Sequence, residues 1–143
     1  MGVISSDPLN NINYRSIIHE TDSKKLEPDT VYEVLPLDTK TYLYRTAREI
    51  YIHKKGEMQK IENPKNFRFG PSHLIDGKIY IYVRKQGLFQ LNDGKLSIVT
   101  GTEVFKTTDQ GINGVFKEKG GLVIVTRRAG IFRLKSGVLK HLD

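Results

Sequence analysis

The 143-residue sequence contains no cysteine and no tryptophan, and it has only two methionines. Without cysteine the chain can form neither disulfide bonds nor thiolate metal sites, and the redox compartment stays open. No apolar run approaches the ~20 residues of a membrane span, and the first eleven residues lack the apolar stretch of a secretory signal. These absences predict a chain without a membrane segment or signal peptide of its own.

Catalytic motifs are missing as well. The four histidines (His19, His53, His73 and His141) do not have the spacing of metal ligands. There is no phosphate-binding loop, nucleophile elbow or zinc-protease signature. The sequence therefore predicts a protein that is not an enzyme and that uses no cofactor or metal.

The chain is rich in positive charge. Lys and Arg number 23 against 16 Asp and Glu, which gives a net charge of +7. Such a balance favours acidic partners. The basic residues form neither a block nor a stripe along one helix face, so nucleic acid is not expected to be the partner.

One stretch of sequence occurs three times. Residues 78–99 (KIYIYVRKQGLFQLNDGKLSIV) are repeated at 121–142 and, more weakly, at 41–61. Gly56, Gly94 and Gly137 coincide in this alignment, at a period of about 40 residues. Each copy follows a loop and a further short strand, so that the unit has four strands. This period and strand number are typical of a β-propeller blade.

The repeat divides the chain. Residues 1–11 are predicted to form an N-terminal arm and residues 12–143 a single β-repeat domain, with a strand expected at 12–19. The three units cover approximately residues 31–61, 72–99 and 112–142.

Apolar patterning distinguishes the strands within a unit. Residues 79–83 and 122–125 are continuous apolar runs, as expected for strands covered on both faces, and Tyr80 and Tyr82 are predicted to pack between blades. The last strands alternate, which indicates one wet face. Asp93-Gly94 is predicted to form a hairpin turn. Gly87 is expected where a side chain would crowd a neighbouring backbone.

These units resemble the two-component regulator propeller family, the β-propeller repeats of hybrid two-component sensors. The residues that carry the resemblance are Asp76-Gly77, Gly87-Leu88-Phe89 and Gly94-Lys95-Leu96, with Gly120-Gly121 and Gly130-Ile131-Phe132 in the third unit. It covers about residues 12–142, but the tryptophan and Gly-Thr ending usual in the family's second strand are reduced to Thr126. The resemblance implies an all-β propeller in a periplasmic or other extracytoplasmic sensor domain. The role it implies is non-catalytic ligand binding in signal transduction. A cytoplasmic location remains open.

Three units are too few for a closed ring, since propellers have ~4–8 blades. Three arrangements remain open: an incomplete propeller that belongs to a longer sensor chain, a ring completed by a second copy, and a β-trefoil.

The predicted binding residues lie in the turn between the second and third strands of each unit. They are Arg45 and Arg48, Arg84 and Lys85, and Arg127 and Arg128. Repeats place equivalent turns on one face, and arginine suits anionic groups, so the expected ligand is an anionic oligosaccharide or another small molecule. Entering loops with Asp29, Thr107, Thr108, Asp109 and Asn113 could bind sugar hydroxyls or simply form turns. Charged turns also protect sheet edges from aggregation. The alternative function is a protein or polysaccharide interaction module without a signalling role.

Overall fold

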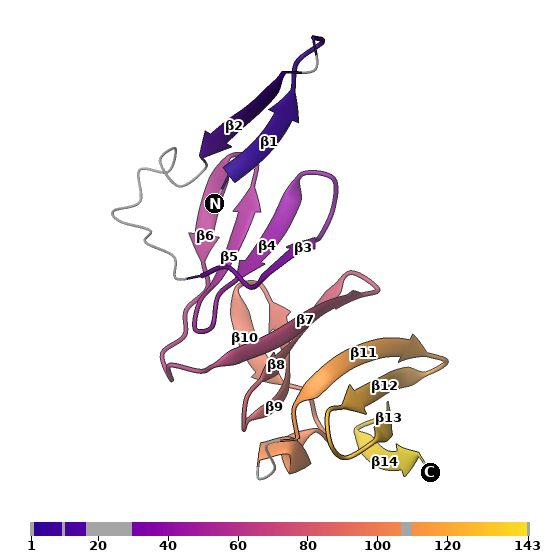
Figure 1. Ribbon diagram of the computed structural model, residues 1–143. Helices are drawn as coiled ribbons and strands as arrows, with labels where there is room; N and C mark the ends of the chain where they lie inside the picture. The colour runs from indigo at the N-terminus through magenta and orange to yellow at the C-terminus, as the bar shows by residue number, and fades with distance from the viewer. Residues whose placement is uncertain (1, 10, 17–29, 107–109, 143) are drawn as a thin grey trace.

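The computed structural model describes residues 2–9, 11–16, 30–106 and 110–142. Within these ranges the protein consists almost wholly of β-strands in four antiparallel sheets (Figure 1). The prediction of an all-β fold is confirmed. No helix in the described ranges is long and apolar enough to cross a membrane.

Three of the sheets have four strands each, connected in chain order. The first sheet contains β3 (Glu33–Pro36), β4 (Thr41–Arg45), β5 (Ile50–Lys54) and β6 (Glu57–Lys60). The second contains β7 (Phe69–Ile75), β8 (Lys78–Val83), β9 (Gly87–Asn92) and β10 (Lys95–Ile98). The third contains β11 (Ile112–Glu118), β12 (Gly121–Thr126), β13 (Ile131–Lys135) and β14 (Val138–Leu142). A short 3₁₀ helix, η1 (Glu103–Lys106), lies between β10 and β11.

The N-terminal residues form a separate hairpin. Where the sequence predicts an arm over 1–11, the structure contains β1 (Gly2–Ser6), which pairs with β2 (Ile12–Ser16). The turn between them is shaped by Asp7, whose carboxylate accepts hydrogen bonds from the backbone N–H groups of Leu9 and Asn11, at 2.9 Å each. Residues 17–19 of the expected strand lie outside the described residues.

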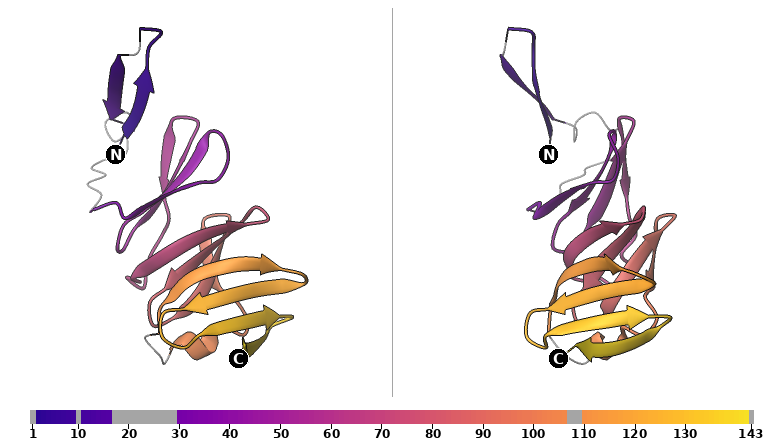
Figure 2. Two further views of the ribbon diagram at one scale, coloured as in Figure 1. Left: turned by 45° about the vertical axis from the view of Figure 1, so that its right-hand side comes forward. Right: turned by 90° about the vertical axis from the view of Figure 1, so that its right-hand side faces the viewer.

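The three four-stranded sheets follow one another so that their first strands are neighbours. Strand β7 lies beside β3 on one side and β11 on the other, as two views show (Figure 2). Apolar side chains fill both spaces between sheets, with Leu43 and Ile81 fully buried in the first and Leu88 and Ile124 in the second. Each such side chain contributes roughly 1.5–3 kcal/mol to the free energy of unfolding.

Burial along the strands follows their position in this stack. Residues 80–83 of β8 are all buried, as predicted, because the second sheet has a neighbour on each face. The same prediction for residues 122–125 is wrong: buried and half-buried residues alternate along β12, and Val123 and Val125 stay half-buried because no sheet formed by the described residues covers that face. Strand β10 alternates exposed with half-buried residues, as predicted for a last strand.

Two turns depend on glycine as predicted. Asp93 and Gly94 have φ angles of 47° and 76°, the paired positive values of a tight two-residue hairpin. A Cβ on Gly87 would lie 2.9 Å from the carbonyl oxygen of Thr102, so the close backbone approach expected there is present.

Candidate functional site

Five of the six cations predicted to bind ligand lie in the turns between second and third strands. Arg48, Arg84, Lys85, Arg127 and Arg128 are all exposed. Arg45 differs, because it is the last residue of β4 and only 9% exposed. The structure therefore divides the predicted set into five surface cations and one buried one.

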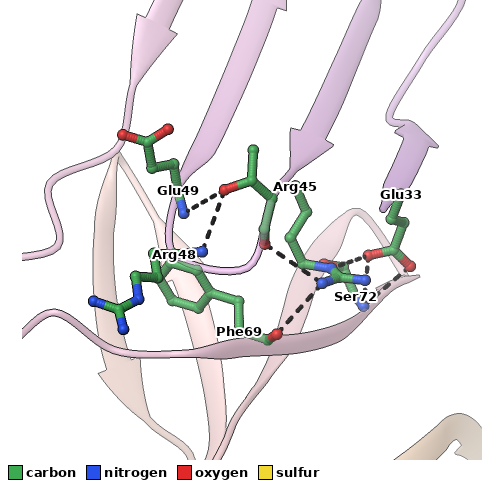
Figure 3. A network of polar contacts seen from close by, with 7 residues as sticks. Glu33, Arg45, Arg48, Glu49, Phe69 and Ser72 are labelled. Carbon is green, nitrogen blue, oxygen red and sulfur yellow. Dashed lines mark hydrogen bonds and ion pairs between the residues drawn. The ribbon is translucent and has the colours of Figure 1, made fainter. Parts of the chain in front are cut away.

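Arg45 connects the first sheet to the second. Its Nε donates to Glu33 Oε2 at 2.8 Å, and its Nη1 donates to the carbonyl oxygen of Phe69 at 3.3 Å (Figure 3). The Glu33 carboxylate also accepts the backbone N–H of Ser72, at 3.0 Å to Oε2. Since Phe69 and Ser72 belong to β7, this network holds β3 and β4 against the neighbouring sheet.

The strand register explains why Arg45 is buried. Arg45 pairs with Ile50 as Tyr82 pairs with Leu88 and as Val125 pairs with Ile131. Arg45 thus occupies the strand position of Tyr82 and Val125 and faces the next sheet. The first turn is one residue shorter than the others, and this difference is not visible when the units are aligned on Gly56 and Gly94.

Arg48 is bonded to the loop after β6 and lines none of the three basic cavities described below. The hydroxyl oxygen of Thr46 accepts the backbone N–H groups of Arg48 and Glu49, at 3.2 and 2.9 Å, which fixes the first turn. The Arg48 side chain donates to Asn66 Oδ1 at 3.2 Å. Asn63 donates to the Arg48 carbonyl oxygen at 2.8 Å, so the loop after β6 is tied to this turn. Arg48 consequently supports that loop.

The remaining cations line three cavities, and two of these are also lined by Arg68, a residue that the sequence analysis did not select. The first cleft, about 330 Å³, lies between the first and second sheets and is lined by Arg45, Arg68 and Arg84. Arg68 directly precedes β7, and its carbonyl oxygen accepts the Arg84 N–H at 2.8 Å. The sequence feature that could have identified Arg68 is its position in the loop that enters the second unit, opposite a basic turn.

The second cleft lies between the second and third sheets. It has a volume of about 320 Å³, and Arg84, Arg127 and Arg128 line it together with Tyr82 and Asn113. Arg84 therefore borders both clefts. Of the predicted sugar-binding loop residues, Asn113 lines this cleft, whereas Asp29, Thr107, Thr108 and Asp109 lie outside the described residues.

A third cavity, the loop pocket, extends the basic surface. It has a volume of about 620 Å³ and is lined by Lys65, Arg68, Arg84 and Lys85, among others. No carboxylate lines either cleft or this pocket within the described part of the chain. The side chains of Arg84, Lys85, Arg127 and Arg128 form no ion pair with any described residue. The arrangement can accept negative charge from outside.

Buried polar atoms without partners gather on β7 and β8. Within the described residues, Ser72 Oγ, His73 Nε2 and Tyr82 OH are buried and have no hydrogen-bond partner, and His53 Nδ1 of β5 shares this property. Burial lowers the pKa of His73 below 6.5, and the charge of Glu33 opposes the shift. An unpartnered buried polar group is destabilising by about 1–3 kcal/mol.

The other surfaces of the described residues provide fewer groups that could bind a ligand. The pocket on the outer edge of the third sheet, about 570 Å³, is lined by Glu118 and Arg133, which pair at 2.5 Å and so satisfy one another. Among the described residues, no group of three His, Asp or Glu side chains could hold a metal ion.

No protein family, curated protein or solved structure matches the chain.

Proposed function

We propose that this chain is a non-catalytic binding protein built from propeller-type blades, and that its basic turns bind an anionic ligand. Three consecutive four-stranded antiparallel sheets with adjacent first strands support the blade interpretation. A β-trefoil is disfavoured because the described strands pair only within their own sheets.

In this proposal the ring is completed by the rest of a longer sensor chain or by a second copy. The outward face of the third sheet supports this, since Phe116 and Ile131 are 57% and 43% exposed there. Blades normally cover such residues with the next blade. Light scattering separates a self-completed ring, with at least twice the chain mass, from a monomer.

The observation that carries the ligand proposal is the gathering of Arg84, Arg127 and Arg128 in one cavity that no described carboxylate lines. Arginine binds carboxylate, sulfate and phosphate through paired N–H groups. An anionic oligosaccharide fits, because it carries several such groups at regular spacing and can reach both clefts through Arg84.

The resemblance to two-component regulator propellers adds a sensor role to the proposal. A ligand bound between two sheets would favour one relative arrangement of them, and a downstream element would respond to that shift in population. An extracytoplasmic location belongs to the same proposal.

A second candidate is an interaction module that binds an acidic polymer or protein without signalling. The loop pocket favours it, because Lys65 and Lys85 extend the basic surface beyond the clefts. A short acidic oligosaccharide would then bind much more weakly than a long one, whereas a sensor of small ligands would bind both with similar affinity.

Calorimetric titration with hexagalacturonate, and with maltohexaose as the neutral match, tests the proposal. The wild type should bind hexagalacturonate alone, and the variant R84Q/R127Q should bind it at least about tenfold more weakly. The control K54Q/K95Q removes the same charge from exposed lysines on β5 and β10 and should bind like the wild type. Equal binding of both sugars, or equal loss in both variants, would refute the proposal.

A further inference from the structure

In the first cleft, the lining residue Arg45 is already paired with a carboxylate that the chain itself supplies. Glu33, on β3, accepts hydrogen bonds from Arg45 Nε at 2.8 Å and from the backbone N–H of Ser72 at 3.0 Å (Figure 3). Its side chain is 22% exposed. One of the three arginines of this cleft is therefore already neutralised by an internal anion.

The second cleft has no such anion at the equivalent place. There Tyr82 takes the strand position of Arg45. Opposite Tyr82, the register of β7 shifts between Phe69 and Ser72, so Gly70 and Pro71 stand where Glu33 stands in the first sheet. Neither has a carboxylate.

Gly70 leaves room for the tyrosine ring. A Cβ on Gly70 would lie 2.5 Å from Tyr82 Cδ1, so a larger residue would displace the ring. Gly70, Pro71 and Tyr82 all line the second cleft. The tight fit holds the ring in the wall of the cavity.

Hydrogen-bond donors surround this place, and no described carboxylate lines the cleft. Tyr82 is 3% exposed, and its hydroxyl has no partner among the described residues. Arg84, Arg127 and Arg128 line the same cavity and form no ion pair within the described ranges. A buried tyrosine hydroxyl usually has a hydrogen-bond partner.

We infer that the second cleft is a carboxylate-binding site, in which a ligand carboxylate takes the place that Glu33 takes in the first cleft. The Tyr82 hydroxyl donates to one carboxylate oxygen, and the turn arginines pair with the charge. This inference rests on the proposed anion-binding function and deepens it. It assigns the ligand to the class of uronic-acid sugars and other carboxylates, and it locates binding between the second and third sheets.

Calorimetry with hexagalacturonate as the probe tests the site through matched variants. Y82F removes a single hydroxyl and should weaken binding about tenfold, the usual effect of losing a hydrogen bond to a charged group. R127Q should weaken binding by a similar or larger factor. R68Q, which changes the first cleft and the loop pocket alone, should alter affinity less than about twofold. Because the hydroxyl has no partner in the free protein, Y82F should leave the urea midpoint unchanged or raise it.

The outcomes separate the inference from the proposed function. Wild-type protein that binds no acidic oligosaccharide would refute both. Binding that R68Q abolishes and that Y82F leaves intact would retain anion binding but overturn the second-cleft site. A sulfated hexasaccharide that binds as tightly as hexagalacturonate, with the same loss in Y82F, would overturn the assignment to carboxylates.

Discussion

The buried ion pair between Arg45 and Glu33 offers the sharpest test of how the first two sheets are held together. We consider three variants, R45M, E33Q and the double variant. Methionine keeps most of the apolar volume of the arginine stem, and glutamine keeps an oxygen that can accept the Ser72 N–H bond. The variants therefore remove charge with little change in packing.

The expected magnitudes follow from burial. The two side chains are 11% and 22% exposed, and breaking such a pair from one side destabilises a protein by about 3–5 kcal/mol. We expect about 3 kcal/mol for R45M, because Glu33 keeps some contact with water and the Ser72 N–H. We expect about 2 kcal/mol for E33Q, the contribution of hydrogen bonds to a charged group.

The double variant should be destabilised by about 3 kcal/mol, less than the sum of the single changes, which corresponds to a coupling of about 2 kcal/mol. Urea unfolding followed by circular dichroism measures all three free energies. K117Q is the control, because the Lys117–Asp76 pair is 64% and 59% exposed and exposed pairs contribute little.

Strict additivity of R45M and E33Q would refute the reasoning. It would mean that the two side chains do not interact in solution. A loss in K117Q as large as that in R45M would contradict the importance given to burial.

Three further predictions concern single residues. Burial lowers the pKa of His73, so as the pH falls the unfolded chain takes up a proton at this histidine before the folded protein does, and the folded protein loses stability. H73L should therefore lose less unfolding free energy than the wild type between pH 7.5 and 5.5. An equal loss in H73L and the wild type would contradict this prediction. T46V leaves two turn N–H groups without their acceptor and should cost about 1–2 kcal/mol in urea unfolding. T46S keeps the acceptor and should lose less than about 1 kcal/mol, the contribution of the buried methyl group; a larger loss in T46S than in T46V would contradict the role of the hydroxyl. G70A should displace the Tyr82 ring and destabilise the protein by about 1–3 kcal/mol, and a wild-type urea midpoint would contradict the close contact.

The strand order was predictable because the same pattern of strands and turns occurs three times in the sequence. Dipeptides that end in glycine, such as Asp93-Gly94, indicate hairpin turns that need positive φ angles. Continuous apolar runs indicate strands that lie between two sheets. The N-terminal hairpin was not predictable, because the signal for its turn is the single carboxylate of Asp7. The half-burial of Val123 was also hidden, since it depends on which face has a neighbour.

The candidate site was predictable in part. Basic turns at equivalent positions indicate one cationic edge, and the structure gathers Arg84, Arg127 and Arg128 in one cleft. The role of Arg45 depends on a turn that is one residue shorter, and that of Tyr82 on a register shift in the facing strand. Sequence spacing does not reveal such shifts, because they appear only when strands pair.

Nuclear magnetic resonance of arginine side chains tests the central claim most directly. In protein with ¹⁵N-labelled arginine, titration with hexagalacturonate should shift the Nε–H signals of Arg84 and Arg127. The signal of Arg133, paired with Glu118 on the outer edge, should stay in place. Shifts confined to Arg133, or no shifts at saturating ligand, would contradict a carboxylate ligand between the second and third sheets.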